Sequence, residues 1–140
     1  MKEEIQKKLE YLSKYVNQLR NFEDVGVAYL QDHPMELAAI ERFFQLAIEA
    51  VLDICSMIIS YEGLNKPDEY KKSILELGVK GILNKEFANR FSNIAGFRNI
   101  LVHNYAEIEV EKVHYNLTNN LKDFDDFAKQ IANYLKELAI

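Results

Sequence analysis

Residues 34–61 read PMELAAIERFFQLAIEAVLDICSMIISY and predict one long helix. Pro34 suits the first turn of that helix, and Asp32 or His33 can cap it. Apolar residues recur every three or four positions and form two stripes, one made of Ile40, Phe44, Ala47, Val51, Ile54, Ile58 and Tyr61 and the other of Phe43, Leu46, Ala50 and Met57. A helix with two apolar faces belongs at the centre of a fold, or it also meets a second subunit.

The same periodicity predicts helices on both sides of this segment. The first helix ends before the Gly26 region and has an apolar face of Ile5, Leu9, Leu12, Val16 and Leu19. Downstream, Gly63 and Pro67 break the pattern. A short helix then runs from a cap at Asp68 to Leu77, with Gly78 at its C-terminal end.

Two longer helices complete the chain. One begins after a cap at Asn84, runs to about His103, and carries Phe87, Phe91, Ile94 and Leu101 on one side. The other has the cleanest pattern, with apolar residues at Val113, Leu117, Leu121, Phe124, Ala128, Ile131, Leu135 and Leu138. The alternation typical of strands is missing, so we expect an all-α fold, an up-and-down four-helix bundle with an additional short helix, as a single domain over residues 1–140.

Composition limits what such a domain does. Hydrophobic residues make up 49% of the 140 residues and the net charge is −5, which argues against a general nucleic-acid binder, so any RNA contact must be local. The single cysteine, Cys55, lies in an apolar run and excludes an internal disulfide. The charged start is unlike a signal peptide, and about 18 apolar residues never run together. We therefore expect a cytoplasmic protein without a membrane span.

Common catalytic signatures are missing from the sequence. It contains no glycine-rich phosphate loop, no Gly-x-Ser-x-Gly elbow and no paired metal-ligand spacing. The three histidines, His33, His103 and His114, lie far apart; His33 suits a helix cap and His114 a helix surface. We therefore expect neither a metal nor a cofactor.

One segment, residues 96–105 with the sequence GFRNILVHNY, concentrates polar groups at the end of an apolar helix. The imidazole of His103 can exchange protons with an RNA 2′-hydroxyl or a leaving oxygen. The guanidinium of Arg98 can bind the nonbridging phosphate oxygens, and Asn99 can hold the imidazole or the substrate. In the simpler alternative, Arg98 and His103 only complement the helix dipole, and Tyr105 is a half-buried aromatic.

Other charged residues are weaker candidates for the same site. Glu41, Arg42, Glu49 and Asp53 lie near one side of the long helix and could line a cleft, although ordinary surface polarity explains them equally well. A local positive patch could come from Arg98 with Lys80 or Lys85, which are near it in sequence.

The pattern of Arg98, Asn99 and His103, followed by Asn104 and Tyr105, resembles the HEPN signature as found in HepT toxins. Residues 39–50 resemble the second helix of that family, and residues 77–83 resemble its middle connection. The resemblance covers most of the chain, from about Ile5 to the end.

This resemblance implies a metal-independent endoribonuclease toxin, active as a homodimer in which Arg98 and His103 of both subunits face one cleft. Asn99 becomes a polar accessory residue. The family also implies a partner, a minimal nucleotidyltransferase antitoxin that attaches AMP to a tyrosine matching Tyr105. The alternative is a noncatalytic HEPN module that binds a nucleotide or a nucleotidyltransferase as a scaffold.

Overall fold

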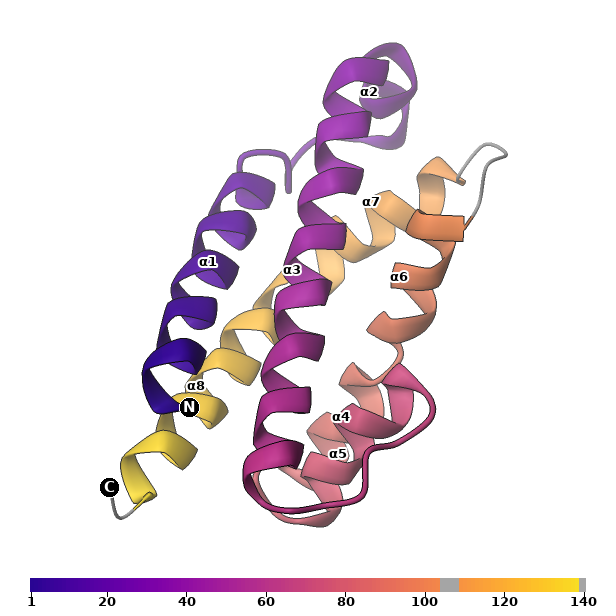
Figure 1. Cartoon of the computed structure of the whole chain (residues 1–140). Helices are drawn as coiled ribbons and strands as arrows, with labels where there is room; N and C mark the ends of the chain where they lie inside the picture. Colours follow the sequence, from indigo (N-terminus) through magenta and orange to yellow (C-terminus); the bar gives the residue numbers. More distant parts are fainter. Residues whose placement is uncertain (104–108, 139–140) are drawn as a thin grey trace.

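The computed structural model describes residues 1–103 and 109–138, with the side chain of His103 excepted. Over these residues the protein is all-α and has eight helices and no strand (Figure 1). The helices are α1 (Lys2–Arg20), α2 (Val27–Asp32), α3 (Pro34–Tyr61), α4 (Tyr70–Val79), α5 (Lys85–Phe91), α6 (Ile94–His103), α7 (Val110–Asn119) and α8 (Leu121–Glu137).

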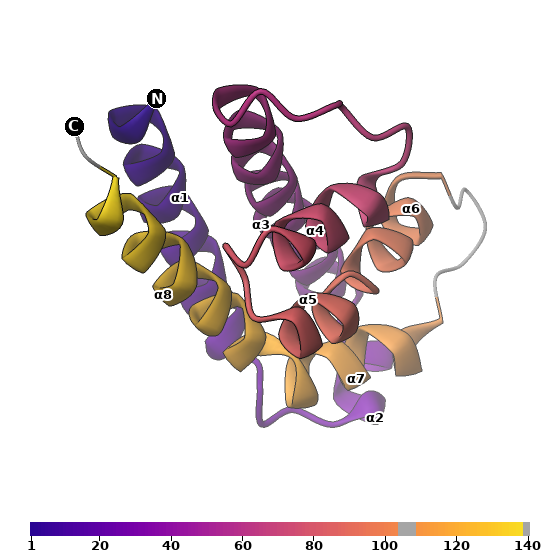
Figure 2. The same cartoon turned by 90° about the horizontal axis from the view of Figure 1, so that it is seen from below.

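Helix α3 lies at the centre and packs against α1, α2, α4 and α6. Helices α1, α3, α6 and α8 alternate in direction, so the expected up-and-down arrangement is present (Figure 1). Helix α8 returns along α1, while α4 and α5 pack on each other at one end of the bundle (Figure 2). The start of α1 and the end of α8 therefore lie at the same end of the molecule.

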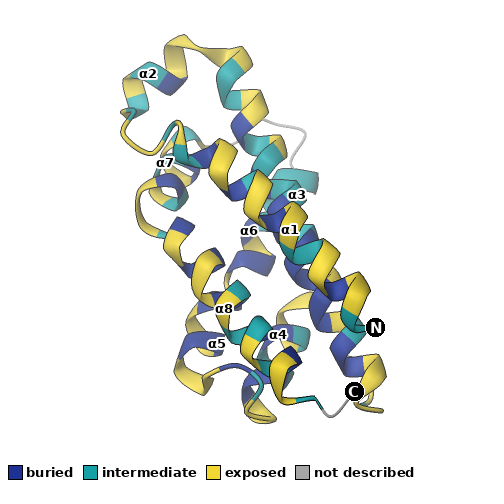
Figure 3. Ribbon diagram, turned by 90° about the vertical axis from the view of Figure 1, so that its left-hand side faces the viewer, coloured by how far each residue is buried: buried dark blue, intermediate teal, exposed yellow. Residues whose placement is uncertain are grey.

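The core is formed by the apolar stripes that the sequence predicts. Buried and exposed residues alternate along α1 and α8 with helical periodicity (Figure 3). At the centre of an aromatic cluster, the Phe91 ring lies 5.0 Å from Phe87, 5.6 Å from Phe124 and 5.4 Å from Phe127. Rings at these separations add favourable contacts to the burial of their area, which fixes α5 against α8.

Helix α3 qualifies the expectation that no segment could cross a membrane. It is the one helix of the described chain that is long and apolar enough to span a bilayer by length and composition alone. Of its apolar window, however, 56% is buried inside the protein. Its first stripe faces the core, including Ile40, Phe44 and Val51, which are at most 1% exposed. The prediction is wrong for Tyr61 at the end of the helix, which is 47% exposed. Packing against four other helices accounts for its apolar composition.

The predicted number of helices was too small. The helix expected from Asn84 to His103 is divided into α5 and α6 at Ser92, whose buried hydroxyl donates to the Asn89 carbonyl. The helix expected from Val113 onward begins at Val110 and is divided at Asn120, while α2 was not predicted at all. Side chains in α7 hydrogen-bond backbone carbonyls one turn earlier, from Asn116 to Lys112 and from Asn119 to Tyr115. Such bonds compete with the helical backbone and favour a break.

Glycines near the end of α4 have different roles from the predicted one. Gly78 lies inside the helix, and a Cβ built there would be 2.6 Å from the Cβ of Ala88 in α5. Gly81 follows the helix with φ of 74°, and the amide of Ile82 donates to the Leu77 carbonyl. Gly81 is thus the terminating glycine, and Gly78 allows α4 and α5 to approach closely.

Candidate active site

Helix α6 positions the predicted Arg98 and Asn99. Ile94 and Phe97 are buried on its inner face, and the Phe97 ring meets Phe44 of α3 edge-on at 5.3 Å. These contacts fix the rotation of α6 against α3. Arg98 is then half-buried and directed toward α4, where its guanidinium carbon lies 5.0 Å from the centre of the Tyr70 ring, and Asn99 is exposed.

Arg98 and Asn99 line an open pocket of about 810 Å³ between three helices and a loop. Its wall is formed by Leu52, Asp53 and Ser56 of α3, by residues 66–69 of the connection that follows, by Tyr70 and Ser73 of α4, and by Arg98 and Asn99 of α6. The central helix, the short helix and the motif helix thus meet at one site.

The guanidinium of Arg98 has no carboxylate partner among the described residues, although acids line the same pocket. Asp53 pairs with Lys8 of α1 at 3.0 Å, and Asp68 pairs with Lys72 at 3.1 Å. Lys72 also lowers the pKa of Asp68 by hydrogen bonding and by its charge. The Nε of Arg98 is buried and has no hydrogen-bond partner among the described residues, which is a costly state for a polar group.

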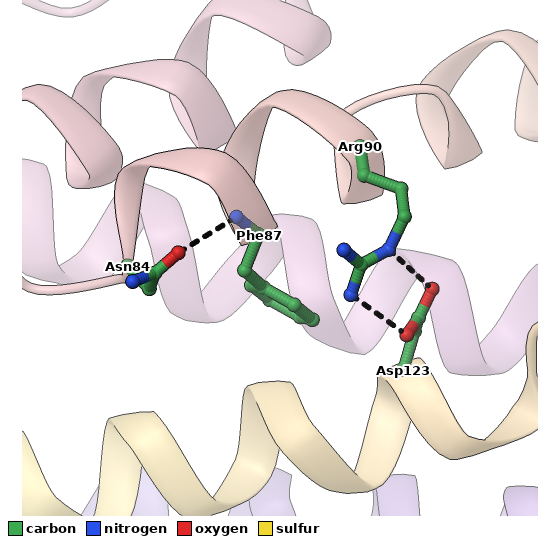
Figure 4. Close-up of polar contacts among 4 residues, drawn as sticks. All are labelled: Asn84, Phe87, Arg90 and Asp123. Atoms are coloured by element: carbon green, nitrogen blue, oxygen red, sulfur yellow. Dashed lines mark hydrogen bonds and ion pairs between the residues drawn. The ribbon is translucent and has the colours of Figure 1, made fainter.

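Arg90 provides a contrast on the neighbouring helix. Its Nε and Nη2 donate to the two carboxylate oxygens of Asp123 at 3.4 and 3.2 Å, and its guanidinium also lies over the Phe87 ring (Figure 4). Asn84 caps the same helix as predicted, because its side-chain oxygen accepts from the amide of Phe87 at 3.0 Å. Arg90 thus joins α5 to α8, whereas Arg98 makes no such bond within residues 1–103 and 109–138.

The remaining predicted site residues fall into two groups. His103 is the last residue of α6, and its side chain is outside the described set; Asn104 and Tyr105 lie outside the described residues altogether. Of the four weaker candidates on α3, Asp53 lines the pocket, whereas Glu41, Arg42 and Glu49 do not.

The expected contribution of Lys80 to this site is wrong. Lys80 lines a different pocket with Glu62 and Tyr134, whose hydroxyl donates to Glu62. Lys85 lines neither of these two pockets. The second cation in the Arg98 pocket is Lys66. Neither Lys66 nor Tyr70 was predicted, since a separation of about 30 residues from the motif carries no periodic signal.

The other histidines and the cysteine have structural roles. His33 occupies the position before α3 but does not cap it, because its ring stacks on Tyr29 at 3.9 Å and its Nδ1 lies 2.7 Å from the Tyr29 carbonyl. His114 was predicted at the surface but is half-buried, with Nε2 3.0 Å from the Val25 carbonyl. Cys55 is buried as predicted, and burial raises the pKa of its thiol.

Comparison with known proteins identifies relatives across nearly the whole chain. A family model described as Ribonuclease HepT-like matches residues 5–131. The tRNA nuclease HepT of Aphanizomenon flos-aquae is 31% identical over 132 residues, which are 94% of this chain and 89% of that protein. The mRNA nuclease HepT of Shewanella oneidensis is 24% identical over 120 residues, 86% of this chain and 90% of the relative.

Solved structures share the fold at lower identity. The tri-AMPylated HEPN toxin of Shewanella oneidensis, in complex with an MNT antitoxin, has a TM-score of 0.83 at 20% identity and covers 92% of this chain and 96% of its own. The protein YutE of Bacillus subtilis, described as cytosolic and of unknown function, has a TM-score of 0.75 at 20% identity. That match covers 94% of this chain and 90% of YutE. These likenesses confirm the HEPN-like fold.

Proposed function

This chain belongs to the HepT-like ribonuclease family, and from that premise we propose that it is a metal-independent endoribonuclease, the toxin of a toxin–antitoxin pair. The observation that carries the proposal is the guanidinium of Arg98, which lies in the wall of an open pocket without a carboxylate partner among the described residues. A planar guanidinium in that state can donate hydrogen bonds to two phosphate oxygens.

The proposed reaction is transfer of the phosphodiester within the RNA strand. The 2′-oxygen attacks the phosphorus, the bond to the 5′-oxygen breaks, and the products are a 2′,3′-cyclic phosphate and a free 5′-hydroxyl. The 2′-hydroxyl loses a proton and the leaving 5′-oxygen gains one; His103 carries out one of these transfers and water the other. Arg98 stabilises charge on the nonbridging oxygens as it develops. Asn99, exposed on the same helix, orients the imidazole or the substrate.

Arg98 and His103 act in a homodimer in this proposal. Five helical steps separate the two positions on α6, a rotation that leaves them about 140° apart around the axis with a rise of about 7.5 Å. The two positions therefore lie on different faces of α6, and a dimer can bring Arg98 of one subunit and His103 of the other to one phosphate.

Regulation follows from the partner that the family implies. A minimal nucleotidyltransferase antitoxin attaches AMP to Tyr105, two residues beyond His103, and the adduct blocks the RNA phosphate by its bulk and its charge. The AMPylated relative in complex with its MNT antitoxin supports this part of the proposal. An RNA substrate and an antitoxin partner favour the cytoplasm as the site of action.

Cleavage assays on defined RNA test the function. The purified protein should cut RNA in the presence of EDTA and leave cyclic phosphate ends. His103→Ala and Arg98→Ala should each lower the rate by about 10²- to 10⁴-fold while the fold is retained by circular dichroism. Arg42→Ala is the matched control, because this exposed arginine of α3 does not line the pocket.

Equal cleavage by the His103→Ala protein would contradict the catalytic assignment. A dimer that leaves RNA intact, with and without removal of AMP, would instead support the noncatalytic scaffold. The modification site is tested by intact mass after coexpression with a nucleotidyltransferase antitoxin. The mass should increase by whole AMP units, and Tyr105→Phe should abolish the increase.

A further inference from the structure

Tyr70 is an exposed aromatic residue in the wall of the Arg98 pocket. It is the first residue of α4, and its side chain is 50% exposed although it contacts the guanidinium of Arg98. That contact orients both planes by cation–π attraction. Part of the ring surface nevertheless remains open beside the proposed phosphate site.

The remaining lining has the mixed character of a site for a small planar ligand. Leu52 and Pro67 contribute apolar surface to the pocket. Hydrogen-bond donors and acceptors come from Ser56, Ser73 and Asn99. The volume of about 810 Å³ is within the range of pockets that hold small molecules. Three acids also line the pocket, of which Asp53 pairs with Lys8 and Asp68 with Lys72. Glu69 remains as a negative charge near the cations Arg98 and Lys66.

We infer that this pocket receives one unpaired nucleobase of the RNA, adjacent to the phosphate bound by Arg98, and that Tyr70 supplies its stacking surface. The inference rests on the proposed function and names its substrate class, single-stranded or looped RNA. Bases in a duplex are stacked and paired, whereas unpaired bases stack on aromatic rings and guanidinium planes. Lys66 binds a neighbouring phosphate.

Substitution of Tyr70 tests the stacking role. Tyr70→Leu should lower kcat/KM on single-stranded RNA by about 5- to 150-fold, the cost of one lost base–aromatic stack. Tyr70→Phe keeps the ring and should retain the activity. Tyr11→Leu is the matched control, since Tyr11 is 41% exposed and lies under a cation, Lys14 at 5.7 Å, but is located on α1 outside the pocket.

A second substrate separates base binding from mere positioning of Arg98. Once the cleaved bond is mapped, the nucleotide on each side is replaced in turn by an abasic ribose. At one of the two positions, the abasic ribose should lower cleavage by the wild type as much as Tyr70→Leu lowers cleavage of intact RNA. The same abasic substrate should not lower cleavage by the Tyr70→Leu variant any further. If Tyr70→Leu reduces cleavage of intact and abasic RNA by the same factor, Tyr70 only positions Arg98 and the inference is overturned.

Binding distinguishes this inference from the proposed function itself. Fluorescence anisotropy with the His103→Ala protein should show tighter binding of a single strand than of the same sequence as a duplex. The double variant with His103→Ala and Tyr70→Leu should bind the single strand and the duplex equally. If the wild type cuts no RNA but shows this preference, only the proposed nuclease activity is disproved. If the wild type cuts RNA, but binds and cuts single strands and duplexes equally, only the proposed base pocket is disproved.

Discussion

Arg90 and Arg98 are eight residues apart, and their side chains have opposite surroundings. The Nε–Nη2 edge of Arg90 is occupied by the carboxylate of Asp123, and its plane lies over Phe87. Its charge is therefore already paired with a carboxylate, which weakens its attraction for a phosphate. Arg98 contacts an aromatic ring instead, and its buried Nε has no partner in the part of the chain that the structure describes. The local partners therefore separate a structural arginine from one suited to bind substrate.

Lys66 gives a prediction at the same scale. If it contacts one phosphate of a single strand, Lys66→Ala should weaken RNA binding and reduce the slope of log K against log salt by about 0.7. Titrations between low and physiological salt measure this slope. Lys80→Ala, in the pocket of Glu62 and Tyr134, should leave the slope unchanged. The same change in both variants would show that only net charge matters.

Individual residues also show the limit of prediction from this sequence. Arg98 and Asn99 were identified because they belong to a short motif within one helix. Tyr70 and Lys66 reach the same pocket through the packing of α4 on α6 and through the course of the loop before it. No spacing in the sequence encodes that tertiary contact. Lys80, chosen for its nearness in sequence, lies in another pocket.

Among the helices, the apolar stripes were predicted better than the boundaries. Leu117 and Leu121 lie on opposite sides of the break at Asn120, and both are buried as the continuous pattern required. Burial depends on periodicity, which a short interruption preserves. The break itself depends on side-chain hydrogen bonds to the backbone, such as that of Asn119 to Tyr115, which periodicity does not register.

The contact between α4 and α5 leads to a prediction about stability. Gly78→Ala would bring two methyl groups within 2.6 Å, so the helices must separate. Overpacking costs about 1–3 kcal/mol, and the gain in helix propensity offsets about 1 kcal/mol of it. Urea denaturation should therefore show a net loss of up to about 2 kcal/mol.

The partner methyl group provides the control for this substitution. Ala88→Gly should cost less in the Gly78→Ala protein than in the wild type, because it removes the clash. Additive effects of the two substitutions would show that α4 and α5 already have room for the extra methyl group.

For the whole molecule, the proposed dimer predicts complementation between inactive variants. Arg98→Ala retains His103, and His103→Ala retains Arg98, so a mixed dimer has one of each in its shared cleft. Refolding the two variants together should restore part of the cleavage that neither has alone. Sedimentation should give twice the chain mass of 16.3 kDa. A mixture as inactive as its components would show that each subunit works by itself.

The paired ends of the bundle have a practical consequence. Helix α8 finishes beside the start of α1, and both views place this corner away from α6 (Figures 1 and 2). A fluorophore or an immobilising tether joined there would report on strand binding without crowding it, and a short peptide bridging the two ends would permit a circularly permuted chain.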